Sequence, residues 1–298
     1  MEPDVSTPEK WQFLLSAIIE GSLQRVKYFI QKFFPKSYKS QIHTCSPDLF
    51  KENPPLHQAV LTASDEVVLL LIDSGFDVHG RNRYDETPLH LACRKGRDVI
   101  VHRLLECEAD IDSRDCAQNT PLFNAATYSH PHTAEVLVQA GCDINTQNEE
   151  LMTPLDQAIL YDQRETISIL LKAGCEVKKT NGFVYYDDHY VNSVVHSLWQ
   201  NGDSNNIKLL QNCGYEMKYS DIKRLVQWKY QVIQGVEISE TDKAVIKEIM
   251  TQPLPLMNCC RISIREVLSK VNKRCTLEKL STRLPLPRCL KDFIAFKV

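Results

Sequence analysis

The chain has 298 residues, of which 43% are hydrophobic and 24% are charged, and its formal net charge is −3. This composition is ordinary for a globular protein of one or two domains, and no stretch approaches the run of about 20 apolar residues that a membrane span requires. The opening MEPDVSTPEKW lacks the basic and apolar segments of a secretory signal. We therefore expect a cytoplasmic protein, with the nucleus open as a second location, no membrane insertion, and reduced thiols at its eleven cysteines.

The predicted elements begin after a short N-terminal stretch, 1–10, that we expect to be flexible. The segment FLLSAIIEGSLQRVKYFI, from Phe13 to Ile30, then predicts two helices that meet at Gly21. It aligns with clearer units downstream and is interpreted as a degenerate first copy of a repeat. Extra residues around Pro35–Cys45 separate it from those units.

Four regular copies of one pattern follow. Thr-Pro-Leu begins at Thr87, Thr120 and Thr153, which are 33 residues apart, and Pro-Pro-Leu begins one interval earlier at Pro54. The copies also end alike, in LIDSGFDVH, LLECEADID, LVQAGCDIN and LLKAGCEVK. Constant spacing with matching ends predicts stacked repeats. The expected cores are 54–79, 87–112, 120–145 and 153–178.

The start of one copy predicts a capped helix with one apolar face. Thr87 can cap the helix through its hydroxyl, and Pro88 loses no useful N–H at the first helical position. Leu89, Ala92 and Cys93 share one face at helical spacing, and the small alanine lets a neighbouring helix approach closely.

The second half of the copy predicts another helix and a projecting turn. Gly96 ends the first helix, and Asp110 to Asp115 reads as a polar turn. Since a buried aliphatic side chain contributes about 1.5–3 kcal/mol, stacking of neighbouring copies is what makes such units fold. The apolar stripe expected on the second helix consists of Val99, Ile100, Leu104 and Leu105.

A second degenerate copy, VVHSLWQNGDSNNIKLLQNCGYEM, closes an array of about six repeats that spans 11–217. Extra residues around Thr180–Tyr190 precede this copy, and two helices are expected to bridge 218–252 to the C-terminal segment. The aromatic residues of the insertion fit either a core or a binding patch, and these are Tyr185, Tyr186, Tyr190 and Trp199.

The repeat resembles the ankyrin repeat, through its TPLH-type starts and its G-[AFC]-[DE]-[VI] ends, from about Trp11 to Met217. This resemblance implies an all-α ankyrin-repeat solenoid. His57 and His90 are similar to the structural histidine of the family, which bonds within and between repeats, and a metal or catalytic role for either is the less favoured alternative.

The same resemblance implies a concave binding surface made by the turns and the first helices. Taken singly, any residue of this surface is an ordinary solvated side chain, so that only the surface as a whole is a candidate site. The residues that it would contain are Arg81, Asn82, Tyr84, Arg94, Lys95, Arg114, Tyr128, Gln147 and Asn148.

The C-terminal segment, 253–298, does not fit the repeat. Leu256, Cys260 and Ile264 follow Pro255 at every fourth position and would form a narrow apolar ridge on one helix. Such a ridge fits either a hydrophobic groove on another protein or the last repeat of this chain. Further on, Leu284-Pro285-Leu286-Pro287 predicts a stiff extended stretch, because its prolines fix φ and remove two N–H donors.

This segment resembles the SOCS box, a small three-helix domain, in the order and spacing of these two motifs. The resemblance implies that Leu256, Cys260 and Ile264 bind elongin C within elongin B–C, and that 284–287 binds cullin-5. The whole chain is thus identified as a member of the ankyrin-repeat and SOCS-box family. It would be a substrate-recognition subunit of a cullin-5 ubiquitin ligase, joined by the RING subunit and an unidentified protein substrate.

An alternative is a non-catalytic ankyrin scaffold whose SOCS box serves stability rather than ubiquitin transfer. In neither case do we expect a catalytic residue or a cofactor, since no nucleophile–base set or Gly-rich phosphate loop is present. A metal site is not expected either, because the cysteines form no CxxC pair.

Two smaller features complete the sequence. Asn145, in LVQAGCDIN, resembles the ankyrin asparagine that an oxygen-dependent hydroxylase modifies, although an ordinary turn role is the favoured explanation of this residue. Residues 251–298 carry ten Lys and Arg against three Asp and Glu. Because these charges are interspersed with apolar ridges, a solvated face or an acidic partner is favoured over nucleic acid.

Overall fold

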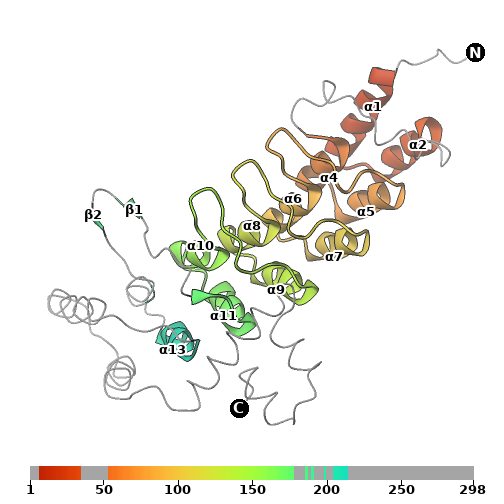
Figure 1. Cartoon of the computed structure of the whole chain (residues 1–298). Coiled ribbons are helices and arrows are strands. Elements are labelled where there is room, and N and C mark those ends of the chain that lie inside the picture. The colour runs from red at the N-terminus through yellow and green to blue at the C-terminus, as the bar shows by residue number, and fades with distance from the viewer. Residues whose placement is uncertain are drawn as a thin grey trace, which may run out of the picture. The chain divides into compact units, whose positions relative to one another are not determined.

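The computed structural model describes residues 7–34, 53–177, 185–186, 189–190, 198 and 204–213. The chain divides into two compact units, Met1–Val136 and Leu137–Val298, and each is described by itself. The regular secondary structure of the described residues is helical apart from one two-stranded ladder, which confirms the all-α ankyrin fold (Figure 1).

The first unit consists of stacked helical hairpins. In each regular hairpin an inner helix begins at a proline and an outer helix returns antiparallel to it. The inner helices α4, α6 and α8 pack in sequence, and the outer helices α5 and α7 pack behind them (Figure 1). The helices are α1 (Thr7–Ile19), α2 (Leu23–Phe33), α4 (Pro55–Thr62), α5 (Asp65–Asp73), α6 (Pro88–Lys95), α7 (Asp98–Glu106) and α8 (Pro121–Thr127), followed by α9 (Pro131–Ala140), which contains the boundary between the units.

The N-terminal hairpin, α1 with α2, begins earlier than predicted. Residues 7–10 belong to α1, so the expectation that all of 1–10 is flexible is wrong for them. Trp11 anchors this hairpin: it is 4% exposed, and its ring lies 4.4 Å from that of Phe34 and 6.2 Å from that of Phe76, centroid to centroid. Gly21 joins the two helices with a φ of 69°, as its place in the pattern predicted.

Helix boundaries follow from capping chemistry. The Thr120 hydroxyl accepts a hydrogen bond from the Phe123 N–H at 3.4 Å, and Pro121 occupies the first helical position. At the other end of an inner helix, Gly96 takes a left-handed φ of 65° and closes α6. A Cβ at Gly96 would also clash with the His130 ring. Both the left-handed φ and the lack of space therefore require glycine at this position.

The core of a repeat is formed by the predicted face of the inner helix. Leu89, Ala92 and Cys93 are all 0% exposed. The stripe predicted on the outer helix is partly wrong, because Val99 is 55% exposed and Val101 is buried in its place. Since α7 begins at Asp98, positions 100, 101 and 104 face inward and position 99 faces solvent.

The second unit continues the same construction. Its helices are α10 (Pro154–Leu160), α11 (Arg164–Ala173) and α13 (Ser204–Asn212), and strand β1 (Tyr185–Tyr186) pairs antiparallel with β2 (His189–Tyr190). Helix α13 packs on α11, where Asn206 Nδ2 donates to the Arg164 carbonyl at 2.9 Å and Leu210 is 0% exposed.

Several sequence predictions fall on residues outside the described part. They include the bridge, 218–252, the SOCS box, 253–298, and the side chains of the aromatic insertion. Leu256, Cys260 and Ile264, and Leu284 to Pro287, therefore remain predictions. Among the helices that are described, none has the length and apolar character needed to cross a membrane.

Candidate protein-binding surface

Three consecutive repeats of the described part each end in a projecting turn that one Asn or Asp side chain holds in shape. We call these turns the first finger (81–86), the second finger (114–119) and the third finger (147–152). In the first, Asn82 Oδ1 accepts hydrogen bonds from the N–H groups of Tyr84 and Glu86, at 2.9 and 3.0 Å. Asp115 Oδ1 accepts the same pair of bonds at 2.9 and 2.8 Å, and Asn148 Oδ1 accepts its pair at 3.0 Å each. The fingers are thus copies of one side-chain-closed turn.

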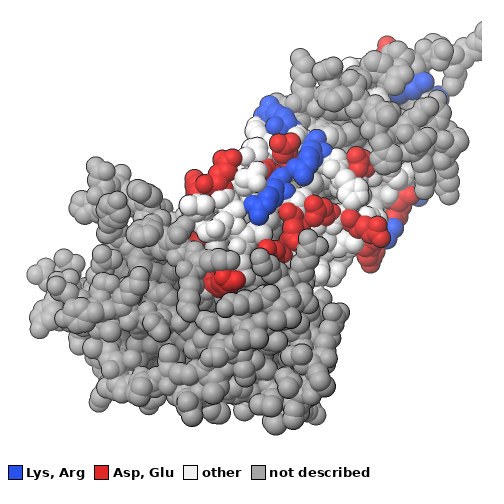
Figure 2. All heavy atoms as spheres, viewed as in Figure 1, with Lys and Arg blue, Asp and Glu red and all other residues white. Residues whose placement is uncertain are grey.

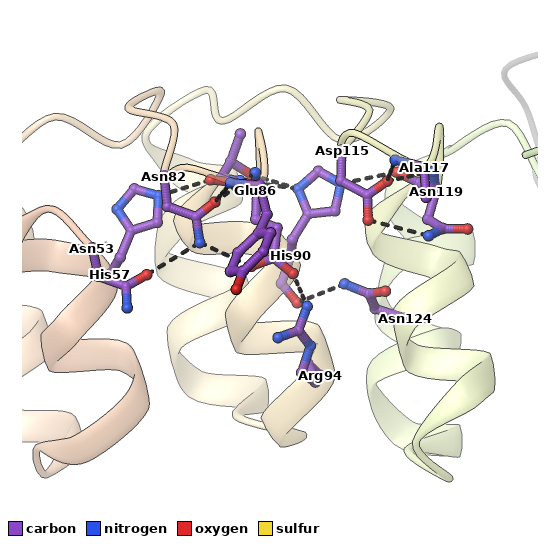
Figure 3. Close-up of polar contacts among 12 residues, drawn as sticks. Asn53, His57, Asn82, Glu86, His90, Arg94, Asp115, Ala117, Asn119 and Asn124 are labelled. Atoms are coloured by element: carbon purple, nitrogen blue, oxygen red, sulfur yellow. Dashed lines mark hydrogen bonds and ion pairs between the residues drawn. The ribbon is translucent and has the colours of Figure 1, made fainter. Parts of the chain in front are cut away.

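Asn82 is part of the scaffold rather than of the binding surface, so this sequence prediction is wrong. It is only 8% exposed, and its Nδ2 donates to Asn53 Oδ1 at 3.1 Å and to Glu86 Oε2 at 2.9 Å (Figure 3). Gln147 and Asn148 of the third finger are half-buried and likewise engaged, since Gln147 Nε2 donates to the Leu151 carbonyl at 2.9 Å. These three side chains set the shape of a finger.

The fourth residue after the start of each finger adopts a left-handed backbone. Its φ is 58° at Asp85, 62° at Gln118 and 59° at Leu151. Asp is a tolerated residue there, whereas a branched apolar residue such as leucine is strained. The strained residue is also exposed, since 58% of Leu151 is accessible.

Two buried histidines tie inner helices to the fingers. Nε2 of His57 lies 2.9 Å from the Glu86 carbonyl oxygen, and Nε2 of His90 lies 3.1 Å from that of Asn119 (Figure 3). A carbonyl oxygen can only accept, so each Nε2 carries the proton. Burial lowers the pKa of His90 and lowers the pKa of His57 to about 4. Both rings are therefore neutral at physiological pH, which confirms their structural role between repeats.

The two histidines differ at Nδ1. In His90 this atom accepts a hydrogen bond from the Thr87 N–H at 3.2 Å. The position that corresponds to Thr87 is Pro54 in the preceding repeat, and proline has no N–H to give. Nδ1 of His57 accordingly has no hydrogen-bond partner within the described residues.

The exposed part of the predicted surface lies on the first two fingers and on the ends of α6 and α8. Tyr84 is 47% exposed and Tyr128 is 49% exposed. Arg94 is half-buried, forms an ion pair with Glu86, and places its guanidinium carbon 5.7 Å from the centre of the Tyr128 ring. Figure 3 shows the Glu86–Arg94 pair beneath the fingers, close to the histidine bonds.

Two bonds join the first finger to the second. Arg81 Nη1 donates to the Arg114 carbonyl at 2.6 Å, and the Cys116 N–H donates to the Tyr84 carbonyl at 2.9 Å. The two fingers therefore present one connected surface, to which Arg81, Tyr84 and Arg114 contribute side chains.

Sequence reasoning missed two exposed members of such surfaces and one buried residue beneath them. Arg83 is exposed, and Glu86 is 4% exposed and pairs with Arg94, but nothing at the equivalent positions of the other repeats singles either of them out. Tyr161, in the second unit, is 50% exposed and lies 33 residues after Tyr128, so the repeat interval could have found it.

Asn145 lies at the turn between consecutive repeats of the second unit. Its Oδ1 accepts a hydrogen bond from the Glu176 N–H at 2.7 Å, and its own N–H donates to Asp143 Oδ1 at 3.0 Å. The side chain is half-buried. Asn145 thus has a structural role, whatever else acts on it.

Comparison with protein families gives two matches. A model described as ankyrin repeats, in three copies, matches residues 56–148 and 89–181, which establishes an ankyrin-repeat protein. A SOCS-box model matches residues 252–295. The chain joins both domains and is an ankyrin-repeat and SOCS-box protein. No curated protein matches it.

The two domains together define a class of function. Ankyrin repeats joined to a SOCS box support a substrate receptor of a cullin-RING ubiquitin ligase. SOCS boxes in general bind elongin B–C and cullin scaffolds, and both domain families are recognition domains rather than catalytic ones.

Proposed function

We propose that this chain is the substrate-recognition subunit of a cullin-5/elongin B–C RING ubiquitin ligase. The observation that carries the proposal is the SOCS-box match at 252–295, which follows the ankyrin repeats and contains both C-terminal motifs. In this assignment the repeats hold a target protein and the C-terminal segment holds the ligase.

The elongin contact is assigned to Leu256, Cys260 and Ile264. Their spacing of four residues predicts that they share one face of a helix, as a narrow apolar ridge. A ridge of this kind binds a hydrophobic groove, and the small Cys260 lets the partner approach where a leucine would be too large.

The cullin contact is assigned to residues 284–287. Pro285 and Pro287 restrict the unbound chain to extended conformations. Little conformational entropy is then lost on docking, which favours recognition of a short segment. Specificity for cullin-5 is part of this proposal and rests on the resemblance of the Leu-Pro-Leu-Pro sequence to that element of the family.

Ubiquitin transfer would then depend on proximity. A target held on the ankyrin surface has its lysines at a high effective concentration near the E2 that the RING subunit recruits. The chemistry belongs to the E2, and we assign no catalytic residue and no cofactor to this chain.

Reconstitution from purified components tests the proposal. We expect the chain to form a complex with elongin B–C and cullin-5 in size-exclusion chromatography, and Leu256→Asp to abolish elongin binding. Pro285→Ala with Pro287→Ala should weaken only the cullin interaction, and Lys270→Asp is a matched control for charge in the same segment.

Two outcomes would contradict the ligase assignment. Failure of the intact chain to bind elongin B–C would remove its basis. Loss of thermal stability in Leu256→Asp without elongin, together with an assembled complex that transfers no ubiquitin, would favour the scaffold whose SOCS box serves stability.

Asn145 is proposed as a hydroxylation site. Because its Oδ1 bonds the Glu176 N–H at 2.7 Å, the repeat must open locally before an enzyme can reach the side chain. Mass spectrometry of the peptide from oxygenated cells should show the gain of one oxygen atom, and its complete absence would leave Asn145 with its turn role alone.

A further inference from the structure

Basic side chains gather on the exposed side of the first two fingers and of α6. Arg81, Arg83 and Lys95 are exposed, and Arg114 is half-buried. Among the described residues, Asp85 is the exposed carboxylate of the two fingers. The surface is therefore positive although the whole chain has a net charge of −3.

The other carboxylates of these fingers are buried and engaged. Glu86 is 4% exposed and paired with Arg94. Asp115 is 7% exposed, and its Oδ1 accepts two N–H groups of its own finger. Both carboxylates are thus already engaged inside the fingers.

The outer helices α5 and α7 carry more acidic than basic side chains, whereas the outer helix of the first hairpin, α2, carries basic side chains and no acidic one. The arginines at α7 are already paired: Arg97 Nε donates to Asp65 at 2.8 Å, and Arg103 Nη2 donates to Asp73 at 2.7 Å. In Figure 2 the Lys and Arg groups gather over the middle of the repeat stack, with Asp and Glu on either side. The basic groups of the two fingers and α6 thus form a local cluster bordered by acidic groups.

Exposed tyrosines lie among the basic groups. The Arg83 guanidinium carbon is 4.6 Å from the centre of the Tyr84 ring, and that of Arg94 is 5.7 Å from the centre of the Tyr128 ring. Tyrosine and arginine, together with tryptophan, are enriched among the residues that contribute most binding energy at protein interfaces.

The surface is also held in place before any partner arrives. Arg81 Nη1 donates to the carbonyls of Asp85 and Arg114, at 2.9 and 2.6 Å, so its guanidinium is fixed between the fingers. Groups that are already ordered lose little entropy when they bind.

From this arrangement we propose that the face formed by Arg81, Arg83, Tyr84, Lys95, Arg114 and Tyr128 binds an acidic, extended segment of a target protein. Carboxylates of the segment would pair with the basic groups, and its apolar atoms would lie on the tyrosine rings. The inference rests on the proposed function, since it specifies the chemistry of the target that the receptor holds.

Protein is favoured over nucleic acid by the size and balance of the charge. Nucleic-acid binding commonly engages about 6–10 phosphates, whereas this face offers four surface cations with Asp85 between them. The sequence pI of about 6.3 is also far from that of a basic nucleic-acid-binding domain.

Selection from an unbiased random-peptide display library on the full-length chain tests the inference. We expect the recovered peptides to be enriched in Asp and Glu relative to the library. Arg83→Glu with Lys95→Glu should lower the affinity of the best labelled peptide about tenfold or more in fluorescence anisotropy. Both side chains are exposed, and circular dichroism checks that the double variant is folded.

The matched control is Lys27→Glu, an exposed charge reversal on α2, which should leave the affinity within about twofold. Peptides without acidic enrichment, an equal loss in Lys27→Glu, or a single-stranded oligonucleotide that displaces the peptide would each overturn the inference.

Elongin B–C co-purification is measured on the same variants. If peptide binding fails while elongin still binds, only this inference falls; if elongin fails to bind while the peptide does, only the ligase assignment falls.

Discussion

Pro54 lies three residues before His57, at the position from which Thr87 donates its N–H to His90 one repeat later. Because proline has no N–H, Nδ1 of His57 is buried without a hydrogen-bond partner among the described residues. An unsatisfied buried acceptor costs about 1–3 kcal/mol, so this site can be improved.

Replacing Pro54 by threonine should stabilise the protein. The new N–H would reach His57 Nδ1 and the hydroxyl could cap α4, which together contribute about 1–2 kcal/mol. Loss of proline's restriction on the unfolded chain removes about 0.4–1 kcal/mol of that gain. A net increase of about 1 kcal/mol in the free energy of unfolding is expected from urea denaturation. Pro54→Ala, which restores the N–H without the hydroxyl, separates the two contributions, and a Pro54→Thr variant less stable than Pro54→Ala would contradict the capping argument.

Acidification should destabilise the first unit through His57. Its pKa is lowered to about 4, chiefly because burial disfavours the charged ring, whereas an unfolded histidine titrates near 6.5. Between these two values the unfolded state binds more protons than the folded state, so stability falls as the pH drops below 6.5. The loss is about 2 kcal/mol at pH 5 by linkage.

The measurement is the free energy of unfolding between pH 7 and pH 5. His57→Phe, the residue type that Phe123 supplies at the same position two repeats later, removes this titration and should flatten the dependence. The pKa of His90 is also lowered by burial, and His90 remains in the variant. The free energy of unfolding of His57→Phe should therefore still fall somewhat as the pH drops. If the free energy of unfolding of His57→Phe depends on pH as steeply as that of the wild type, the pH dependence does not come from His57.

Gly96→Ala should be strongly destabilising. A left-handed φ of 65° costs a residue with a Cβ about 1–2 kcal/mol, and the methyl group would also clash with the His130 ring. Overpacking of this kind adds about 1–3 kcal/mol. The matched control is Gly80→Ala, where the added Cβ would meet its nearest atom, Asp77 Oδ2, at an ordinary 3.5 Å.

A double variant separates strain from clash. His130→Ala removes the ring that the methyl group would strike, but it also removes the bond from Nε2 to the Arg94 carbonyl at 3.0 Å. We therefore expect the loss of stability in Gly96→Ala/His130→Ala to be smaller than the sum of the two single losses. Additive losses would mean that the clash is relieved in another way.

Local signals in the sequence predicted the helices well. The Thr-Pro-Leu starts place the first helical residue at Pro88, Pro121 and Pro154, and the structure has α6, α8 and α10 begin there. These starts depend on a cap and on a fixed φ, which are properties of neighbouring residues. The earlier start of α1, at Thr7, does not follow from the pattern because the Thr-Pro there lacks the leucine that comes next in every regular copy.

The candidate surface was predicted less well, because burial in the fingers arises between repeats. Asn82 lies between two arginines in the sequence and was expected at the surface, yet bonds to Asn53 and Glu86 place it in the interior. The sequence marks Arg81 and Arg114 as separate candidates for the surface. Only the structure shows that the Arg81 side chain donates to the Arg114 carbonyl. A repeat pattern gives the position of a side chain along the chain, whereas its partners in the next repeat depend on stacking.

Leu151→Asn should stabilise the second unit. Leu151 has a φ of 59° and is 58% exposed, so its side chain contributes little packing while its backbone is strained. Asparagine tolerates the left-handed conformation, which should recover about 1 kcal/mol of the strain. The N–H of residue 151, which donates to the Asn148 carbonyl at 3.0 Å, is retained.

Glu150→Asn is the matched control, because residue 150 is exposed in the same finger and does not have a left-handed φ. It should change the free energy of unfolding by less than about 0.5 kcal/mol. Equal effects of the two substitutions in thermal and urea unfolding would show that the strain at Leu151 has already been relieved by its surroundings.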